Sequence, residues 1–440
     1  MGGGLLQLVA LGDQDLYLIG NPQITFFKIV HRRHTNFSME AIQQNISGII
    51  SNKESDIFTK ISNNGDLVSD MWLDVKLPNL TIPTNENYYN WCNNTGHALI
   101  KEIELEIGGQ SIDKHNSKFL DIWNELTNHN NDENFNINKH NTLTSFYDNN
   151  SIETNNLQLY IPLIFFFNRN KGLSLPLIAL QYHDVIIKIK LRSLFHLINS
   201  NNEGIDENYI INQMELKFYC NFIFLDVDER RRFAQSPHEY LIEQVQYHYE
   251  NLSERIKIPF NNPIKEFIWI CQSEIVESGI MTGLIDPSQN ITTLSTNNPN
   301  YVDFTQYNDY FNYQVPYFNE NNNIYSTKEF IYNQISYEPF KSCKLKFNGK
   351  DRFSFQKASY FRTLSPILSG HKKPLKHIYT YSFSLKPEEH QPSGTCNFSR
   401  INNSYIIFEN PATKMNLHLY AINYNILRFM NGMCGLIYDS

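Results

Sequence analysis

Two short groups of residues in this chain of 440 carry side chains whose types could support chemistry. Ser393 and Cys396 lie in a proline-rich turn and would be nucleophiles in a strand–turn–helix elbow. The segment lacks the flanking glycine of such an elbow, and no helical pattern follows it. His31 and His34 could bind a metal, but metal sites need three or four ligands and no carboxylate lies nearby. We therefore interpret the first group as a rigid corner between two strands, and the second as a polar surface that contacts another subunit.

A charged stretch at residues 226–237 raises the possibility of an acid/base pair or a cation site. Its carboxylates, Asp226, Asp228 and Glu229, would be solvated in a linker. A solvated carboxylate lacks the shifted pKa that general acid catalysis needs. Together with Arg230–Arg232, the stretch is more typical of a linker between domains that is held by ion pairs. We predict no catalytic residue, cofactor or metal in this chain.

The composition excludes several further classes of protein. The six cysteines are widely spaced without a C-x-x-C pair, which argues against a zinc site and a disulfide framework and favours a cytosolic chain. The formal net charge is −8 and the basic residues are scattered, so we expect no direct binding to nucleic acid. The most apolar run, residues 157–167, is too short to cross a bilayer.

Alternation of apolar and polar residues dominates the sequence and predicts an all-β protein. The clearest alternating runs are Met71–Leu77, Ile100–Ile107, Val185–Leu191, Met214–Leu225, Glu239–His248 and Met415–Leu427. Two shorter runs, Leu163–Phe167 and Phe222–Leu225, are apolar at every position and predict strands buried on both faces. Many short strands favour β-sandwiches, but the pattern alone does not distinguish a jelly roll from an immunoglobulin-like sandwich.

An internal repeat indicates two related domains. The strand and glycine turn at Glu104–Asp113 correspond to those at Lys344–Phe353, and Gly109 and Gly349 are 240 residues apart (349 − 109). The length of the chain also exceeds a usual single core. We predict an N-terminal arm at residues 1–44, a first domain at 45–224 and a second at 225–440. Asn-rich stretches predict three surface loops, at about residues 127–156, 197–210 and 285–340.

Five stretches resemble, in the same order, the major capsid proteins of large icosahedral double-stranded DNA viruses of the iridovirus, mimivirus and algal-virus types. They are Gln14–Ala41, Leu159–Leu191, Leu225–Tyr247, Tyr381–Ile401 (YSFSLKPEEHQPSGTCNFSRI) and Tyr420–Ser440. The resemblance covers nearly the whole chain and is therefore more specific than any single motif.

The resemblance implies two tandem eight-stranded jelly rolls, and a homotrimer with a pseudo-hexagonal outline that tiles an icosahedral virion shell. It implies neighbouring capsomers and minor capsid proteins as partners, assembly in the host cytoplasm, and an internal membrane beneath the shell. Membrane insertion and enzyme activity are not expected. Candidate subunit contacts are Arg32, Arg33, His34, Arg230, Arg231, Arg232, Glu388, Glu389 and His390. Two alternatives remain at this stage: a minor capsid or scaffold protein of the same fold, and a carbohydrate-binding jelly-roll protein.

Overall fold

The chain, seen in a computed structural model, divides into two compact units, residues 1–37 and 38–440. The structure describes residues 3–13, 15–29, 31–80, 89–92, 94–128, 158–200, 212–277, 281–285, 302–307, 310–313 and 338–438. The first unit contains two short helices, α1 (Gly3–Val9) and α2 (Leu16–Ile19). The second unit contains all of the strands except for the first residue of β1, and it is described by itself below.

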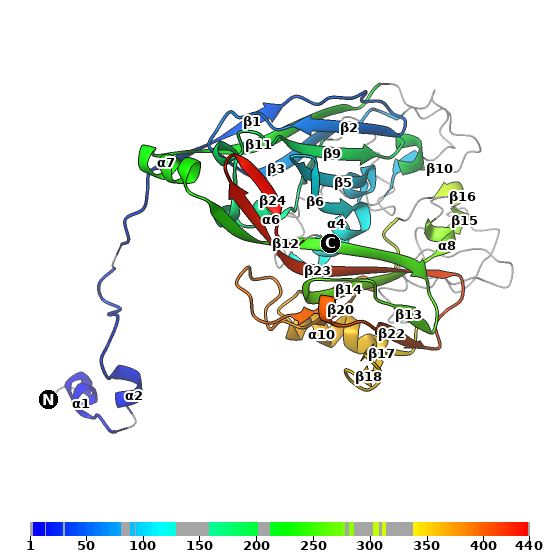
Figure 1. Cartoon of the computed structure of the whole chain (residues 1–440). Coiled ribbons are helices and arrows are strands. Elements are labelled where there is room, and N and C mark those ends of the chain that lie inside the picture. The colour runs from blue at the N-terminus through cyan, green and yellow to red at the C-terminus, as the bar shows by residue number, and fades with distance from the viewer. Residues whose placement is uncertain are drawn as a thin grey trace. The chain divides into compact units, whose positions relative to one another are not determined.

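The first half of the second unit is a sandwich of two antiparallel four-stranded layers (Figure 1). One layer has the order β1–β11–β3–β7, formed by Phe37–Gln44, Glu215–Leu225, Leu67–Lys76 and Gln158–Pro162. The other has the order β2–β9–β5–β6, formed by Ser55–Lys60, Val185–Leu191, Ile100–Ile107 and Gln110–Asn116. This strand order is that of an eight-stranded jelly roll.

The second half repeats the same order of strands. One layer is β12–β23–β14–β20, formed by His238–Asn251, Met415–Met430, Pro263–Ser273 and Tyr379–Ser382. The other is β13–β22–β17–β18, formed by Arg255–Lys257, Ser404–Glu409, Ser342–Phe347 and Lys350–Asp351. Each strand of the first half thus has a counterpart in the second, and the predicted double jelly roll is confirmed.

The predicted repeat occupies equivalent hairpins in the two jelly rolls. Gly108 and Gly109 connect β5 to β6 with φ of 58° and 83°, and Asn348 and Gly349 connect β17 to β18 with φ of 47° and 85°. Positive φ at both central residues is the geometry of a two-residue hairpin turn that follows the twist of the strands. The two similar sequences therefore make the same turn at the same place in each domain.

Burial explains why the alternating sequences form strands. In β2 and β9 every second side chain is buried, so one face of this sheet packs against the core and the other faces solvent. On the solvent face, Lys190 pairs with Glu102 at 3.0 Å across neighbouring strands. Strands β14 and β23 differ because both of their faces are buried. Over residues 267–271 and 415–422, even-numbered apolar residues, such as Ile268 and Ile422, join the core of the first jelly roll, and odd-numbered ones, such as Trp269, join that of the second.

The remaining elements of the second unit lie in the connections between these strands, except for β24, which follows the last of them. The helices and helical turns are α3 (Thr95–Leu99), α4 (Ser117–Thr127), α6 (Phe166–Arg169), η2 (Lys171–Leu173), η3 (Leu177–Ala179), η4 (Leu194–Leu197), α7 (Val227–Gln235), α8 (Glu274–Glu277), the π-helical turn η6 (Tyr360–Leu364), α10 (Ser365–Leu368) and η7 (Phe398–Arg400). Short strands are β4 (Tyr89–Trp91), β8 (Leu175–Pro176), β10 (Ile198–Ser200), β15 (Met281–Ile285), β16 (Val302–Tyr307), β19 (Gln356–Lys357), β21 (Cys396–Asn397) and β24 (Met433–Leu436).

The structure corrects two expectations from the sequence. Residues 163–167, predicted to be a buried strand, contain the start of α6 instead, because the side chain of Asn168 caps this turn by accepting a hydrogen bond from Phe165 N at 3.1 Å. Strand β1 falls within residues 1–44, which were predicted to form an arm. The stretch 226–237, predicted to link the domains, contains α7, whose N-cap is Asp226, and its role as the linker stays a prediction. The division into an arm and two domains at residues 44 and 224 otherwise stays a prediction.

The three Asn-rich stretches lie mainly outside the described residues. Where the structure does describe them, β10 and β16 fall within the second and third stretch and pair with each other in a small sheet, β15–β16–β10–β4. These two strands were not predicted.

Candidate functional site: the junction between the jelly rolls

The two jelly rolls meet where β6 and α4 of the first face the β12–β23–β14 layer of the second. Two of the hydrogen bonds that join the domains link β12 to β6. The Gln244 side chain donates to the carbonyl of Ile112, and the backbone N–H of Val245 donates to Asp113 Oδ1 at 3.0 Å. Polar side chains therefore fix the register between two domains that also share an apolar core.

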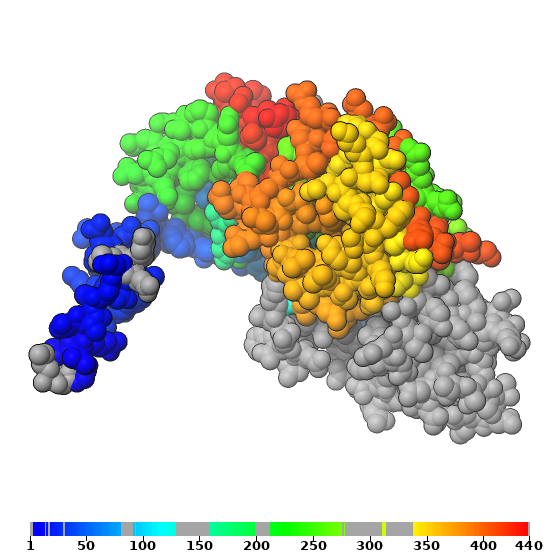
Figure 2. Space-filling model, turned by 90° about the horizontal axis from the view of Figure 1, so that it is seen from below, coloured from blue at the N-terminus to red at the C-terminus, as the bar shows by residue number. Residues whose placement is uncertain are grey.

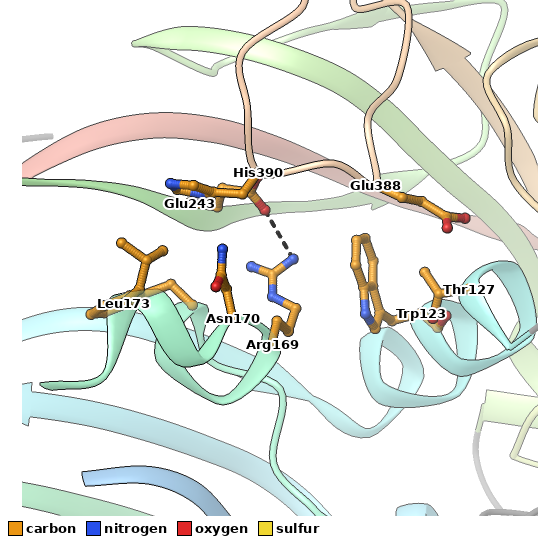
Figure 3. Close-up of a pocket in the computed structure, with 9 residues that line it drawn as sticks. Trp123, Thr127, Arg169, Asn170, Leu173, Glu243, Glu388 and His390 are labelled. Carbon is orange, nitrogen blue, oxygen red and sulfur yellow. Dashed lines mark hydrogen bonds and ion pairs between the residues drawn. The ribbon is translucent and has the colours of Figure 1, made fainter. Parts of the chain in front are cut away.

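A cavity of about 290 Å³ lies at this junction (Figure 3). It is lined by Trp123, Thr127, Phe166, Arg169, Asn170, Leu173, Glu243, Glu388 and His390. The first six come from α4 and the α6–η2 connection of the first jelly roll. Glu243 lies on β12, while Glu388 and His390 belong to the proline-rich corner at residues 386–394. Figure 3 shows the side chains of Arg169 and Trp123 directed toward this second set.

One chain of charges crosses the junction through Glu243. Arg169 Nη1 lies 3.0 Å from Glu243 Oε2, and Lys265 Nζ lies 2.6 Å from Glu243 Oε1. The ammonium of Lys265 also donates to the carbonyl of Pro387, and its side chain is completely buried. Burial lowers the pKa of Lys265, and the nearby carboxylates of Glu243 and Glu266 oppose this effect. A buried cation with two acceptors keeps β14, β12 and the corner in one arrangement.

A second chain of charges centres on His371. Its Nε2 lies 2.8 Å from Glu266 Oε2, and its Nδ1 lies 2.7 Å from Glu388 Oε1. Burial opposes protonation, but the two carboxylates outweigh it and raise the pKa of His371 to about 9. The imidazole is therefore protonated at neutral pH, so both of its nitrogens can donate hydrogen bonds.

A third group joins α4 to β23 further along the junction. Lys118 Nζ lies 2.7 Å from Glu277 Oε1 and 2.9 Å from His418 Nε2. Burial lowers the pKa of Lys118 to about 8 and that of His418 to about 4. For Glu277, burial acts to raise the pKa, but the bond from His418 and the charge of Lys118 outweigh it and hold the pKa well below its usual range. The junction thus concentrates buried ionisable groups, and two of their pairs, Arg169 with Glu243 and Lys118 with Glu277, join one domain to the other.

The arrangement of these side chains is better suited to holding the two domains together than to catalysis. Within the described part of the chain, no three His, Cys, Asp or Glu residues are grouped so that they could hold a metal ion. The hydroxyl of Ser393 is hydrogen-bonded to the backbone of Lys386, which fits the predicted corner. Burial raises the pKa of the half-buried Cys396 thiol, which disfavours a reactive thiolate.

The predicted subunit-contact residues occupy three different settings. Arg32, Arg33 and His34 belong to the unit of residues 1–37. On α7, Arg231 and Arg232 are exposed, while Arg230 Nε pairs with Asp66 Oδ1 at 3.0 Å.

The remaining candidates lie in the corner at residues 386–394. Glu389 pairs with Lys386 at 2.7 Å, while Glu388 and His390 line the junction cavity. Whether any of the nine candidate residues touches another subunit stays a prediction.

Sequence reasoning missed the charged residues that organise the junction. Lys265 and Glu266 stand side by side in the otherwise apolar run of β14. Adjacent charges inside a run that is buried on both faces are a signal of internal partners, because an unpaired buried charge is costly. The partners Arg169 and His371 could not have been named, since nothing local links them to this strand.

Comparisons with known proteins agree with the fold. Residues 25–226 match the family described as "Major capsid protein N-terminus", and residues 229–435 match "Large eukaryotic DNA virus major capsid protein". The chain is 37% identical to the major capsid protein of Pyramimonas orientalis virus over 465 residues, and 37% identical to that of Paramecium bursaria Chlorella virus 1 over 484 residues. Each alignment covers all of both chains.

Solved structures give the same result. A chain of the quasi-atomic model of the PBCV-1 virus capsid superposes with a TM-score of 0.74 at 33% identity, covering 94% of this chain and 100% of that one. The Faustovirus major capsid protein, at 12% identity and a TM-score of 0.63, shares the fold.

The fold and these comparisons define the class: a double jelly-roll protein of a viral capsid. The chain belongs to the family of large eukaryotic DNA virus major capsid proteins, and its role is structural, in the shell of the virion. The resemblance noted in the sequence is confirmed. Among the helices that the structure describes, none is both long and apolar enough to cross a membrane.

Proposed function

We propose that three copies of this chain associate into a capsomer with a pseudo-hexagonal outline, and that such capsomers tile an icosahedral shell. The observation that carries the proposal is the repetition of one strand order in both halves of the chain. Two domains of like topology in each of three chains supply six similar building blocks. A trimer of this kind approximates six-fold symmetry, and a closed ring needs complementary surfaces on each subunit.

An exposed apolar patch supports association. Leu364, Ile367 and Leu368, on η6 and α10, are 47%, 53% and 66% exposed. They belong to the residue 338–410 region, which gathers on one face of the second jelly roll (Figure 2, yellow to orange). Adjacent exposed aliphatic side chains mark interaction surfaces on soluble proteins. We assign this patch to the contact between subunits of one trimer.

The residue 1–37 unit supports a second contact by its charge. It holds three of the 37 basic residues (Lys28, Arg32 and Arg33) and two of the 45 acidic residues of the chain, so residues 38–440 hold 34 basic and 43 acidic residues. Its basic segment is thus complementary in sign to the rest of the protein, and opposite charges steer association. We propose that Arg32, Arg33 and His34 contact a neighbouring copy, together with the exposed arginines of α7.

The acidic excess of the chain also bears on how the shell is placed relative to the genome. A shell protein with a net charge of −8 does not neutralise DNA phosphates, so we propose that another layer, an internal membrane, lies between the shell and the genome. Minor capsid proteins would bind the capsomers, and assembly would take place in the host cytoplasm.

Light scattering on the purified chain, followed by negative-stain imaging, tests the trimer. We expect the mass of three chains and particles with a hexagonal outline. A stable monomer at all concentrations, or a dimer, would overturn the proposal.

A further inference from the structure

Three side chains at the junction form a cluster that pairing of charges alone does not explain. Both oxygens of the Glu277 carboxylate are engaged: Oε1 lies 2.7 Å from Lys118 Nζ, and Oε2 accepts a hydrogen bond of 2.7 Å from Asn416 Nδ2. The amine of a lysine and the amide of an asparagine thus meet on one carboxylate. Asn416 is almost completely buried, and its Oδ1 has no hydrogen-bond partner.

The strand register explains why these groups meet. Asn416 and His418 lie two residues apart on β23 and therefore project from the same face of the strand, which is the face directed at the first jelly roll. Lys118 lies in the first turn of α4 and reaches this face from the other domain, where its Nζ is 2.9 Å from His418 Nε2. Tyr247 on the neighbouring strand hydrogen-bonds His418 Nδ1 at 2.7 Å and helps to fix the ring.

We propose that Lys118 and Asn416 form an intramolecular amide (isopeptide) bond that covalently joins the two jelly rolls. The neutral amine of Lys118 attacks Cγ of Asn416 through its Nζ lone pair. The new Nζ–Cγ bond forms, the Cγ–Nδ2 bond breaks, and Nδ2 leaves as ammonia. The step needs no oxidant, reductant or further reactant.

Glu277 is the catalytic residue of this step because it touches both reacting groups. It takes a proton from the amine and delivers it to the departing nitrogen, so the carboxylate is regenerated. Burial favours the neutral form of Lys118, and a lysine amine in a desolvated site is an effective nucleophile. Lys118 Nζ and Asn416 Nδ2 each lie 2.7 Å from an oxygen of the Glu277 carboxylate, so the two reacting groups are held on one side chain.

The bond would have a clear structural consequence. It would connect α4 of the first jelly roll with β23 of the second, two elements about 300 residues apart in sequence. A crosslink across so long a loop restricts the unfolded chain strongly, and the two domains could no longer separate under load.

The mass of the denatured full-length chain tests the proposal. Loss of one ammonia makes the folded and then denatured wild-type chain about 17 Da lighter than its sequence requires. Proteolysis followed by tandem mass spectrometry is expected to yield one branched peptide that links Lys118 to Asn416. Glu277→Gln keeps the size and polarity of the side chain but removes the proton carrier, and we expect it to restore the full mass. Lys118→Arg and Asn416→Ala also remove the mass deficit, whereas Lys386→Arg, in an exposed ion pair, retains it.

The mass of the wild-type chain shows whether the bond forms even if a variant fails to fold. A wild-type mass equal to that of the sequence, with the Lys118 and Asn416 peptides recovered unlinked, would overturn the proposal. A gain of about 1 Da at Asn416 would mean hydrolysis of the amide instead, and would overturn it equally.

Discussion

His371 Nδ1 lies 2.7 Å from Glu388 Oε1, and this bond ties the proline-rich corner to the segment that follows α10. The other ring nitrogen bonds Glu266 on β14, so one imidazole connects three parts of the second jelly roll. The corner is therefore anchored from the inside through Glu388. That leaves Glu389, which is exposed, better placed than Glu388 to meet a neighbouring subunit.

The protonated state of His371 should make the stability of the second jelly roll depend on pH. Its pKa is raised from 6.5 to about 9 in the folded chain, so the stabilisation is present in full below pH 6.5 and is lost as the pH rises through about 9. The shift in pKa corresponds to about 3 kcal/mol of the free energy of unfolding. Urea unfolding at pH 6 and at pH values above 9 measures this contribution. His371→Gln should remove most of the decrease in unfolding free energy at high pH, whereas His248→Gln, at a more exposed ion pair, should leave that decrease unchanged.

Replacing Lys265 by methionine should destabilise the chain by about 3 kcal/mol, because Glu243 and the Pro387 carbonyl lose a buried partner. The loss is limited because Arg169 still pairs with Glu243. Lys386→Met, at the exposed pair with Glu389, should cost less than about 1 kcal/mol. Midpoints of chemical denaturation compare the two variants. Equal losses would contradict the structural role given to Lys265.

The two glycines of the first hairpin should respond differently to alanine. A Cβ on Gly108 would come within 2.3 Å of His183 Nδ1, whereas a Cβ on Gly109 would meet nothing within 4 Å. Both have positive φ, which costs an alanine about 1 kcal/mol. We expect a loss of about 1 kcal/mol for Gly109→Ala and a clearly larger one for Gly108→Ala, because His183 also accepts a hydrogen bond from Cys434 N. Thermal unfolding would reveal the order, and the reverse order would show that the contact with His183 is unimportant.

The exposed patch on α10 should matter for assembly and little for folding. The double substitution Ile367→Ser and Leu368→Ser removes two aliphatic side chains that are each more than half exposed. The melting temperature of the monomer should therefore hardly change. The trimer population, measured by light scattering across a range of concentrations, should fall. Ile49→Ser, at an exposed isoleucine of the first jelly roll, is the matched control. An unchanged trimer would show that the contact lies elsewhere.

Much of the fold follows from local patterns in the sequence. Each of the six alternating runs coincides with a strand to within one residue, because a half-buried strand requires an apolar residue at every second position. The glycine turns indicated the repeat, since only particular residues tolerate positive φ in a two-residue hairpin. The family resemblance then distinguished the jelly roll from other sandwiches, which periodicity could not do.

The sequence was misleading where a local pattern has two outcomes. The apolar run at residues 163–167 fits a buried strand as well as a buried helical turn, and the cap provided by Asn168 favours the turn. Strand β1 was missed because most of its residues are exposed, so its alternation is weak.

The sequence by itself determined the strands, the tandem repeat and the family, because each depends on neighbours in the chain or on the order of whole segments. Only the tertiary structure decided the junction between the jelly rolls. Arg169 and Glu243, or Lys118 and Glu277, come from elements far apart in the sequence, and they meet because two sandwiches pack against one shared sheet. Such partners are selected by the cost of leaving a buried charge unpaired, and no periodic pattern in the sequence records that cost.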